Sequence, residues 1–470
     1  MGNSWVSGLV RGRELPVSHT HSEQFPAHDN SKDVDHMETF YGLPKEVRFC
    51  NRCVISNQRP NSAVEFRHTP ASTKDSIALD DAGVCDACKV AEAKSSIDWV
   101  TRDQELRELA ARYKRNDGRY DCIVPGSGGK DSFYAAHKLK YEYGLNPLTV
   151  TWAPHIYTEW GFRNHRAWIH AGFDNVLVTP NGRVHRLLTR LAVDRLLHPF
   201  QPFILGQKNL APKMALLYDV PLVFYGEHEA DYGNPRVEFE SARRNWEYFT
   251  SASDKDIYLG GTSLQELRDG WGLRPGDWDS YLPANPAQLE REDVQVHYLG
   301  YYLPWHPQGA YYYTAEHGDF TISPERTPGT YSKYNSIDDK IDDFHYHTTF
   351  IKFGIGRATY DASQEVRSGE LTRDEAVALV HKYDGEFPTR FEKDIYRYLS
   401  LGQHEYPAAA SNLASLEFDR DYYDDLCDQF RSPHLWYRDS TNWNLRHMVQ
   451  STDPMQATNS ATNWVGNAKS

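Results

Sequence analysis

The most informative motif of this chain is Val124-Pro-Gly-Ser-Gly-Gly-Lys-Asp-Ser132. It follows a short apolar run over residues 120–124 and precedes residues 130–143, whose apolar spacing predicts a helix. Where a glycine-rich turn joins a strand to a helix, backbone N–H groups and the positive end of the helix dipole face the same point. The stretch therefore predicts a phosphate-binding site.

Strand-like and helical patterns alternate along the chain around this turn. Apolar runs predict strands at residues 121–124, 148–152, 175–178 and 221–225, and helical patterns occupy residues 130–143, 184–197 and 211–218. Apolar strands that alternate with helices are typical of a parallel sheet with helices on both faces. The sequence therefore predicts an α/β fold built on a doubly wound parallel sheet.

The glycine-rich turn can be compared with three nucleotide-binding motifs. A Walker A loop needs a hydroxyl residue after its lysine, but Asp131 follows Lys130, and the glycine spacing also differs from the G-x-G-x-x-G fingerprint. Residues 127–132 match S-G-G-x-D-S and resemble the PP-loop signature of the ATP pyrophosphatases, whose fold is adenine nucleotide alpha hydrolase-like. Those enzymes cleave ATP between its α and β phosphates and adenylate a substrate. A plain glycine-rich turn is the alternative.

The residue types in the turn suit ATP. Gly128 and Gly129 let backbone N–H groups approach the phosphates without interference from a Cβ atom. The hydroxyls of Ser127 and Ser132 add hydrogen-bond donors, and we expect Asp131 to hold Mg²⁺. The predicted ATP-binding residues are Ser127, Gly128, Gly129, Lys130, Asp131 and Ser132.

Four of the six cysteines form two close pairs, Cys50/Cys53 and Cys85/Cys88. Two C-x-x-C knuckles can present four thiolates tetrahedrally around Zn²⁺, which predicts a closed, structural zinc site. A redox pair and an iron–sulfur cluster are the alternatives, although nothing near the pairs resembles a thioredoxin-like unit. So few cysteines do not make a disulfide scaffold.

Composition and charge disfavour some partners and locations for this protein. The 470 residues carry a net charge of -14, and this acidic balance disfavours a nucleic-acid partner. The sequence has neither an apolar stretch long enough for a membrane span nor the apolar core of a signal peptide at its start, so we expect a cytoplasmic protein away from the membrane.

Changes in composition suggest five segments. We expect a clear helix start after Thr372, which forms a capping box with Glu375. The predicted segments are a disordered arm at 1–45, a zinc-knuckle module at 46–92, a PP-loop ATP pyrophosphatase domain at 93–290, a mainly helical substrate region at 291–435 and a polar tail at 436–470.

Residues 50–406 resemble the N-acetyl sugar amidotransferase family over most of the chain. The segments that carry the resemblance are Arg52–Val54, Gly83–Cys88, Pro125–Ser132, Gln201–Lys208, Phe224–Gly233, Tyr331–Lys340, Ile351–Thr359 and Lys382–Pro388. The resemblance implies a bacterial enzyme that uses ATP to convert a sugar acetamido group to an acetamidino group for surface polysaccharides such as lipopolysaccharide O-antigen. The long gap between the knuckles and His228, where the family more often has asparagine, are departures that bear on the identity of the sugar.

This chemistry assigns candidate roles to charged residues. Lys130, Lys352 and Arg357 are candidates to stabilise the departing pyrophosphate. Glu227 and Glu229, with the nearby Asp231, follow a predicted strand, at the position where an open sheet places its ligands. They are candidates to hold Mg²⁺ or to accept a proton from ammonia. The alternative is that they form a solvated acidic loop. Weaker candidates are Asp338, Asp339 and His345.

The source of ammonia is the remaining question. Cys122 and Cys427 lack the glycine-flanked setting of a class I glutaminase nucleophile, and Gly2 stands where another glutaminase class has cysteine. We therefore expect a separate glutaminase subunit, with or without an ammonia-channel subunit, or use of free ammonia. A PP-loop thiotransferase that acts on tRNA or a small molecule is the alternative function.

Overall fold

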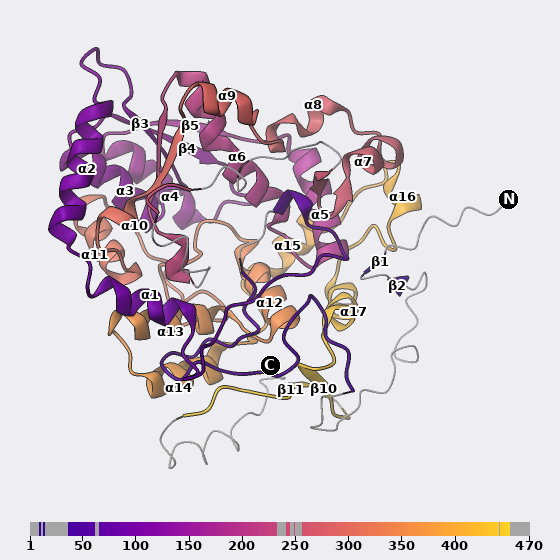
Figure 1. Ribbon diagram of the computed structural model, residues 1–470. Coiled ribbons are helices and arrows are strands. Elements are labelled where there is room, and N and C mark those ends of the chain that lie inside the picture. The colour runs from indigo at the N-terminus through magenta and orange to yellow at the C-terminus, as the bar shows by residue number, and fades with distance from the viewer. Residues whose placement is uncertain are drawn as a thin grey trace.

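The computed structural model describes residues 9–10, 13–14, 36–61, 65–232, 241–244, 249, 256–440 and 442–451. Its main sheet has five strands, all parallel, in the order β5-β4-β3-β6-β9. Figure 1 labels β3, β4 and β5 of this sheet. The strands are β3 (Cys122–Pro125), β4 (Pro147–Trp152), β5 (Asp174–Val178), β6 (Leu222–Tyr225) and β9 (Gln295–Tyr298). The predicted α/β fold with a parallel sheet is confirmed.

Successive side chains of the central strand β3 pack into two different hydrophobic clusters. Ile123 belongs to a cluster that includes helices α5 (Gly182–Leu196) and α6 (Gln201–Tyr218). Cys122 and Val124 belong to a second cluster, built with α2 (Trp99–Tyr113), α3 (Lys130–Tyr141) and α4 (Glu159–His170). Because neighbouring strand residues point to opposite faces, helices cover both faces of the sheet.

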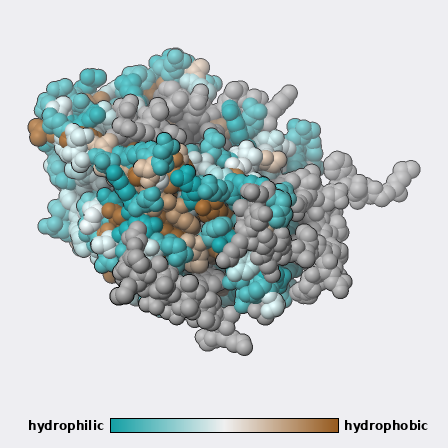
Figure 2. Space-filling view, turned by 60° about the horizontal axis from the view of Figure 1, so that its bottom comes forward, coloured by the Kyte–Doolittle hydropathy of each residue, from teal (hydrophilic) through white to brown (hydrophobic). Residues whose placement is uncertain are grey.

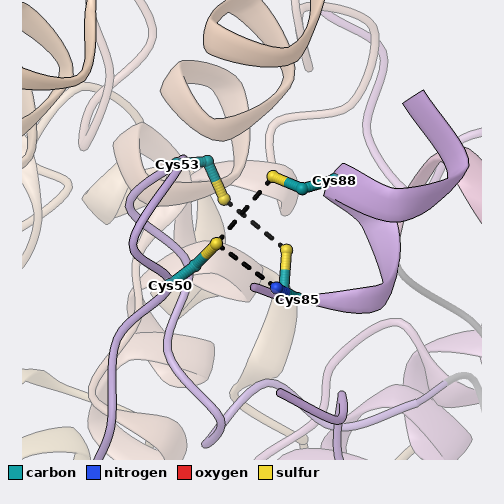
Figure 3. Close-up of side chains that lie close together, drawn as sticks. All are labelled: Cys50, Cys53, Cys85 and Cys88. Atoms are coloured by element: carbon teal, nitrogen blue, oxygen red, sulfur yellow. Dashed lines mark hydrogen bonds between the residues drawn. The ribbon is translucent and has the colours of Figure 1, made fainter. Parts of the chain in front are cut away.

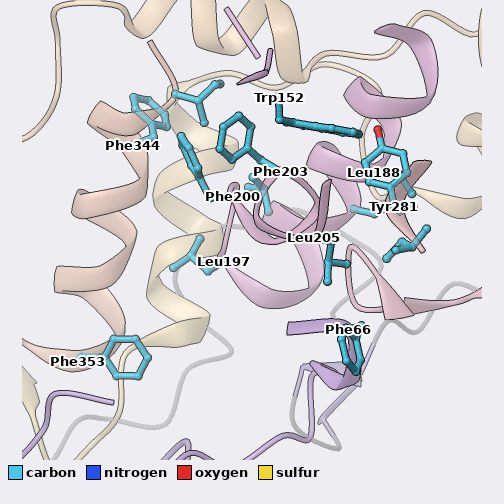
Figure 4. Packing of buried hydrophobic residues seen from close by; sticks show 14 of the residues in the cluster. Phe66, Trp152, Leu188, Leu197, Phe200, Phe203, Leu205, Tyr281, Phe344 and Phe353 are labelled. Carbon is cyan, nitrogen blue, oxygen red and sulfur yellow. The ribbon is translucent and has the colours of Figure 1, made fainter. Parts of the chain in front are cut away.

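The larger cluster is rich in aromatic side chains (Figure 4). The rings of Phe200 and Phe203 meet edge to face with centroids 5.1 Å apart, and the rings of Trp152 and Tyr281 do so at 5.4 Å. A Cβ atom at Gly206 would lie 2.2 Å from the Trp152 ring, so this glycine lets α6 pack closely on strand β4. These contacts fix α6 against the sheet.

The direction of the chain across the sheet reverses at β3. The chain passes from β3 to β4 and β5 on one side, and then crosses to β6 and β9 on the other. The carboxyl ends of β3 and β6 are therefore neighbours at a topological switch point, where open α/β sheets form their ligand sites. This position lies after Pro125 and Tyr225.

Helices from the C-terminal part of the chain lie below the sheet in the view of Figure 1. They include α12 (Asp342–Phe353), α13 (Arg357–Ser368), α14 (Arg373–Tyr383), α15 (Glu392–Leu399) and α17 (Arg420–Phe430). The predicted capping box at Thr372 and Glu375 is present at the start of α14. Among the described residues, no helix is long and apolar enough to cross a bilayer.

The remaining described elements are short. They are β1 (Leu9–Val10), β2 (Arg13–Glu14), η1 (Glu65–Arg67), α1 (Asp86–Lys94), η2 (Glu229–Tyr232), β7 (Tyr258–Leu259), β8 (Thr262–Ser263), α7 (Leu264–Trp271), α8 (Pro275–Trp278), η6 (Asp279–Tyr281), α9 (Pro286–Arg291), α10 (Leu299–Tyr302), α11 (Pro307–His317), α16 (Ala409–Asn412), β10 (Trp436–Arg438) and β11 (Trp443–Leu445). Figure 2 turns the lower face of Figure 1 forward and shows a mainly hydrophilic surface with hydrophobic residues gathered near its middle.

Two segments that the sequence placed in its arm and its tail belong to the folded body. The hydroxyl of Tyr41 donates to the carbonyl of Phe430 at 2.8 Å, and its ring meets that of Phe353 at 5.4 Å. Trp436 is 2% exposed, and its indole N–H donates to the carbonyl of Ile351 at 2.9 Å. Apolar residues in these polar segments thus bury against α12 and α17; most of residues 1–35, and residues 452–470, lie outside the described part.

Candidate functional site

The glycine-rich turn lies between β3 and α3, as the sequence predicts. Gly129 is the N-cap of α3, and the first helical hydrogen bond runs from the N–H of Phe133 to the carbonyl of Gly129 at 3.0 Å. The helix therefore supplies no acceptor for the N–H groups of the residues just before Phe133. Together with the helix dipole, these amides are able to bind an anion.

The two adjacent positions in the turn, 128 and 129, require glycine for different structural reasons. Gly128 has φ of +86°, and a Cβ atom there would lie 2.8 Å from the Cα atom of His165 and 2.9 Å from the carbonyl oxygen of Asn164. Gly129 has an ordinary φ of -66°, and a Cβ atom there would have only the Ser127 hydroxyl within 4 Å, at 3.6 Å. Gly128 therefore allows the turn to pack on α4, whereas Gly129 keeps open the space in front of the turn.

Two adjoining cavities, which we call the first and second lobes, meet at the turn. The first lobe has a volume of about 530 Å³ and the second a volume of about 460 Å³, and Gly129, Asp131 and Glu227 line both. The polar wall of the first lobe includes Arg59, Lys208, Arg244 and Tyr298. The apolar wall of the second lobe includes Val150, Trp152, Phe200, Phe203, Ile204 and Leu210.

Two of the predicted catalytic carboxylates lie together at the turn. Asp131 accepts a hydrogen bond from the Lys130 ammonium at 2.5 Å and from the indole N–H of Trp305 at 3.2 Å. Burial, followed by the charge of Asp131, raises the pKa of Glu227 to about 7. A Cβ atom at Gly226 would lie 2.9 Å from the carbonyl oxygen of Asp131, so this glycine lets the segment after β6, which carries Glu227, pass close to α3. The pair can serve as cation ligands, and Glu227 can exchange a proton near neutral pH.

Arg357 reaches the same place from the C-terminal helices. It begins α13 and lines both lobes. Its guanidinium lies 4.3 Å from the centre of the Tyr346 ring, and its Nε atom lies 3.0 Å from a carboxylate oxygen of Asp361. Burial lowers the pKa of Arg357, but Asp361, Tyr346 and Asp342 outweigh it and hold the pKa above its usual value. A fixed cation therefore faces the turn across the cavity.

Lys352 lies apart from this group. Its ammonium donates to the carbonyl of Leu196 at 2.7 Å and lies 4.9 Å from the centre of the Tyr41 ring. It lines a third cavity, of about 180 Å³, instead of either lobe. Gly354, with φ of +67°, ends α12 between Lys352 and Arg357, which separates two cations that the sequence placed in one motif.

The two weaker acidic candidates, Asp338 and Asp339, both line the second lobe. Asp339 accepts hydrogen bonds from His155 Nδ1 at 2.7 Å and from the backbone N–H groups of His155 and Ile341 at 2.6 and 3.0 Å, so its contacts are structural. Burial raises the pKa of Asp338, and it also raises the pKa of Asp342, a residue of the same lobe that the sequence did not single out.

The other acidic candidates lie on the segment after Glu227. Asp231 forms an ion pair with Lys94 of α1 at 2.6 Å, and it is not among the residues that line either lobe. The side chain of Glu229 lies outside the described part of the chain. His345 lines both lobes and the third cavity, and burial, with His198 next, holds its pKa well below the usual value.

The four predicted zinc ligands form one buried cluster (Figure 3). The sulfur atoms of Cys50 and Cys88 are 3.9 Å apart, and those of Cys53 and Cys85 are 3.7 Å apart. Four sulfur atoms placed tetrahedrally at about 2.3 Å from Zn²⁺ would be about 3.8 Å from one another. The donor set and its spacing therefore fit a zinc ion, and the cluster could bind such a metal.

The cysteine cluster is packed against the C-terminal helices. The Arg367 guanidinium lies 3.9 Å from the sulfur of Cys53 and donates to the carbonyl of Asp231 at 3.0 Å. Arg373 of α14 donates to the carbonyl of Cys53 at 3.2 Å. The cluster thus connects α13, which starts at Arg357, with the segment that follows Glu227.

The C-terminal helices are similar to a known family model. Residues 328–450, which include α12, α13 and α14, match the family model described as "LPS biosynthesis protein WbpG-like, C-terminal domain". This match supports a protein of polysaccharide biosynthesis. An uncharacterized protein of Methanocaldococcus jannaschii is 35% identical over 83 residues, which cover 18% of this chain and 29% of that relative.

Several residues of the cavities carry no local sequence signal. Arg59, Arg244 and Tyr346 come from three different segments and meet only in the folded chain. Lys208 lies in Gln201–Lys208, a segment that carries the family resemblance, and this resemblance could have identified Lys208 as a site residue.

Proposed function

We propose that this chain is an ATP-dependent amidotransferase of surface-polysaccharide biosynthesis. It converts the acetamido group of an N-acetylated, nucleotide-linked sugar to an acetamidino group and releases AMP and pyrophosphate. The observation that carries the proposal is the Ser-Gly-Gly-Lys-Asp-Ser turn at the switch point of a parallel sheet, faced by helices that match a lipopolysaccharide-biosynthesis domain. A PP-loop ATP pyrophosphatase uses such a turn to hold ATP.

The residues around the turn suit ATP and Mg²⁺. The N–H groups at the start of α3 and the hydroxyls of Ser127 and Ser132 would bind the phosphates, and the apolar wall of the second lobe suits the adenine ring. Asp131 is the carboxylate placed to hold Mg²⁺, and Glu227 beside it is the candidate base. When bound, Mg²⁺ would offset phosphate charge and orient the triphosphate.

The proposed reaction has two steps that balance. The acetamido oxygen attacks the α-phosphorus of ATP, the bond to the β-phosphate breaks, and pyrophosphate leaves against the cations Lys130 and Arg357. Ammonia then attacks the imidate carbon, AMP departs with the former acetamido oxygen, and Glu227 accepts a proton from the attacking nitrogen. A separate glutaminase subunit would supply the ammonia.

The thiotransferase alternative requires a reactive cysteine beyond the metal cluster. Burial raises the pKa of Cys122, and it raises the pKa of Cys427 to about 12. Both thiols are buried and remain protonated at neutral pH, whereas sulfur transfer uses a thiolate that is accessible. The cysteine environments therefore favour the amidotransferase.

The test follows AMP and pyrophosphate when the purified chain is given ATP, ammonium and nucleotide-linked N-acetyl sugars. We expect AMP to form in proportion to an acetamidino product, Lys130→Met to abolish it, and the exposed-lysine control Lys393→Met to retain it. We also expect no glutamine turnover by the chain alone. AMP formed only with a sulfur donor and tRNA would favour the thiotransferase, and AMP formed under neither condition would refute both functions.

A further inference from the structure

Three metal-ligating side chains lie together outside the cysteine cluster. They are Glu65, His68 and His198, and each offers one ligand atom that lies within 4.8 Å of the other two. The carboxylate oxygen Oε2 of Glu65 lies 3.0 Å from Nδ1 of His68 and 3.6 Å from Nε2 of His198. Two imidazoles and one carboxylate form a donor set that binds divalent transition metals such as Zn²⁺.

The local fold brings these three side chains together from two segments. Glu65 begins η1 and His68 follows it, and the backbone N–H of His68 donates to the carbonyl of Glu65 at 3.0 Å. His198 follows α5, and the side-chain amide of Gln201 donates to the carbonyl of Glu65 at 2.9 Å. Phe66, which is 2% exposed, packs in the larger hydrophobic cluster and anchors η1 there. Buried contacts thus fix the positions of the three side chains.

The distance between Glu65 and His198 fits a shared ion better than a hydrogen bond. An N–H···O hydrogen bond is about 2.7–3.2 Å long, so 3.6 Å is too long for one. Ligands held tetrahedrally at about 2.0–2.2 Å from Zn²⁺ lie about 3.3–3.6 Å from one another. Among the described residues, Nδ1 of His198 has no hydrogen-bond partner, so the polar contact of this ring is the one that Nε2 makes with Glu65.

The protonation of the three groups suits a cation. Burial lowers the pKa of His68 to about 3 and also lowers the pKa of His198, so both imidazoles are neutral at pH 7. Burial raises the pKa of Glu65, but Lys74 and the two histidines outweigh burial and hold this pKa well below the usual value. Each ring would bind an ion through the nitrogen that faces Glu65 and carry its proton on the other nitrogen.

Positive charge near the three ligands limits their affinity for a metal ion. The Lys74 ammonium lies 3.7 Å from Oε1, the other carboxylate oxygen of Glu65, and Arg59 and Lys352 line the third cavity beside it. Because like charges repel, an ion would bind here more weakly than in the cysteine cluster. We therefore expect the purified chain to keep the zinc of the cysteine cluster and to take up a further ion only when the ion is supplied.

We propose that Glu65, His68 and His198 form a second metal site, which reversibly binds a divalent transition-metal ion such as Zn²⁺. Glu65 and His198 line the third cavity, whose volume of about 180 Å³ leaves room for a water ligand. Glu65 and His68 lie between the two cysteine pairs in the sequence, whereas His198 lies between α5 and α6. A bound ion would therefore fasten the long segment between the knuckles to helices that cover the sheet.

Calorimetric titration of the dialysed full chain with Zn²⁺ tests the site without ATP or sugar. Wild type should bind one further ion, His68→Gln and His198→Gln should each weaken this binding at least about tenfold, and the exposed-histidine control His404→Gln should match wild type. Absence of binding to wild type would overturn the proposal. Unchanged affinity in a folded His68→Gln or His198→Gln chain would overturn it as well.

Three further arms separate this site from the other candidate metal sites. Co²⁺ added to the zinc-loaded chain should show ligand-field absorption without a thiolate-to-metal band, and a thiolate band would place the ion in the cysteine cluster and overturn the proposal. Binding that Asp131→Asn abolishes and His68→Gln leaves unchanged would place the ion at the turn, with the same consequence.

Lys74→Met removes the nearest positive charge and should tighten Zn²⁺ binding at least about threefold. Unchanged or weaker binding in a folded Lys74→Met chain would contradict an ion beside Glu65. Because no arm requires ATP, this site can fail while the proposed reaction holds, and the reverse is also true.

Discussion

Substitution of the two adjacent glycines in the turn should separate fold stability from ATP binding. In Gly128→Ala, a methyl group would have to occupy a site at φ of +86° and 2.8 Å from the Cα atom of His165. Positive φ in a non-glycine residue and displacement of packed backbone together cost about 2–5 kcal/mol. We therefore expect a lower urea midpoint at an unchanged m value.

Gly129→Ala should leave stability unchanged, because φ is -66° and its Cβ atom would meet only the Ser127 hydroxyl, at 3.6 Å. The methyl group would instead stand where a phosphate approaches the turn. Loss of one charge-assisted hydrogen bond, worth about 1.5–3 kcal/mol, weakens ATP binding about 10- to 150-fold.

Urea unfolding and calorimetric ATP titration of both variants measure the two effects. Gly402→Ala is a matched control, since a Cβ atom there meets nothing within 4 Å and no positive φ opposes it. Wild-type ATP affinity in Gly129→Ala would refute the phosphate cradle, and wild-type stability in Gly128→Ala would refute the strain argument.

Three further predictions concern the charged residues and the cysteine cluster. With a carboxyl pKa of about 7, Glu227 becomes a base as the pH rises. At a constant concentration of unprotonated ammonia, the kcat/KM of wild type should therefore rise through pH 7, and in Glu227→Gln this rise should be absent. Arg357→Gln should lower kcat about 10²-fold with a smaller effect on the KM for ATP, as steady-state kinetics would show, because this cation acts on charge that develops as pyrophosphate leaves. Elemental analysis should find one zinc per chain, and chelation or Cys85→Ser should remove it and lower the melting temperature; wild type without zinc would contradict the assignment.

The sheet was largely predictable because four of its strands contain short runs rich in apolar residues. Four of its strands start and end within one residue of their predicted bounds. Strand β9, Gln-Val-His-Tyr, was missed because half of its residues are polar, and its burial is decided by pairing with β6. Helix α6 begins ten residues before the predicted start, at Gln201, because Pro202 and Pro212 obscure its pattern.

The site was less predictable than the sheet because its parts come from distant segments. The turn carries its own motif, so its residues could be named from the sequence. Lys352 and Arg357 are close in sequence, yet the left-handed C-cap at Gly354 directs them to different cavities. Arg59 lines the first lobe although it lies in the cysteine module, a placement that no local pattern specifies.

The fate of the acetamido oxygen shows whether the chain adenylates the sugar. A nucleotide-linked N-acetyl sugar carrying a heavy oxygen isotope in its acetamido group would be incubated with the chain, ATP and ammonium, and the AMP would be analysed by mass spectrometry. We expect the isotope to appear in the phosphate of AMP, because the acetamido oxygen attacks the α-phosphorus. AMP free of the isotope, formed together with an acetamidino sugar, would contradict adenylation of the acetamido group.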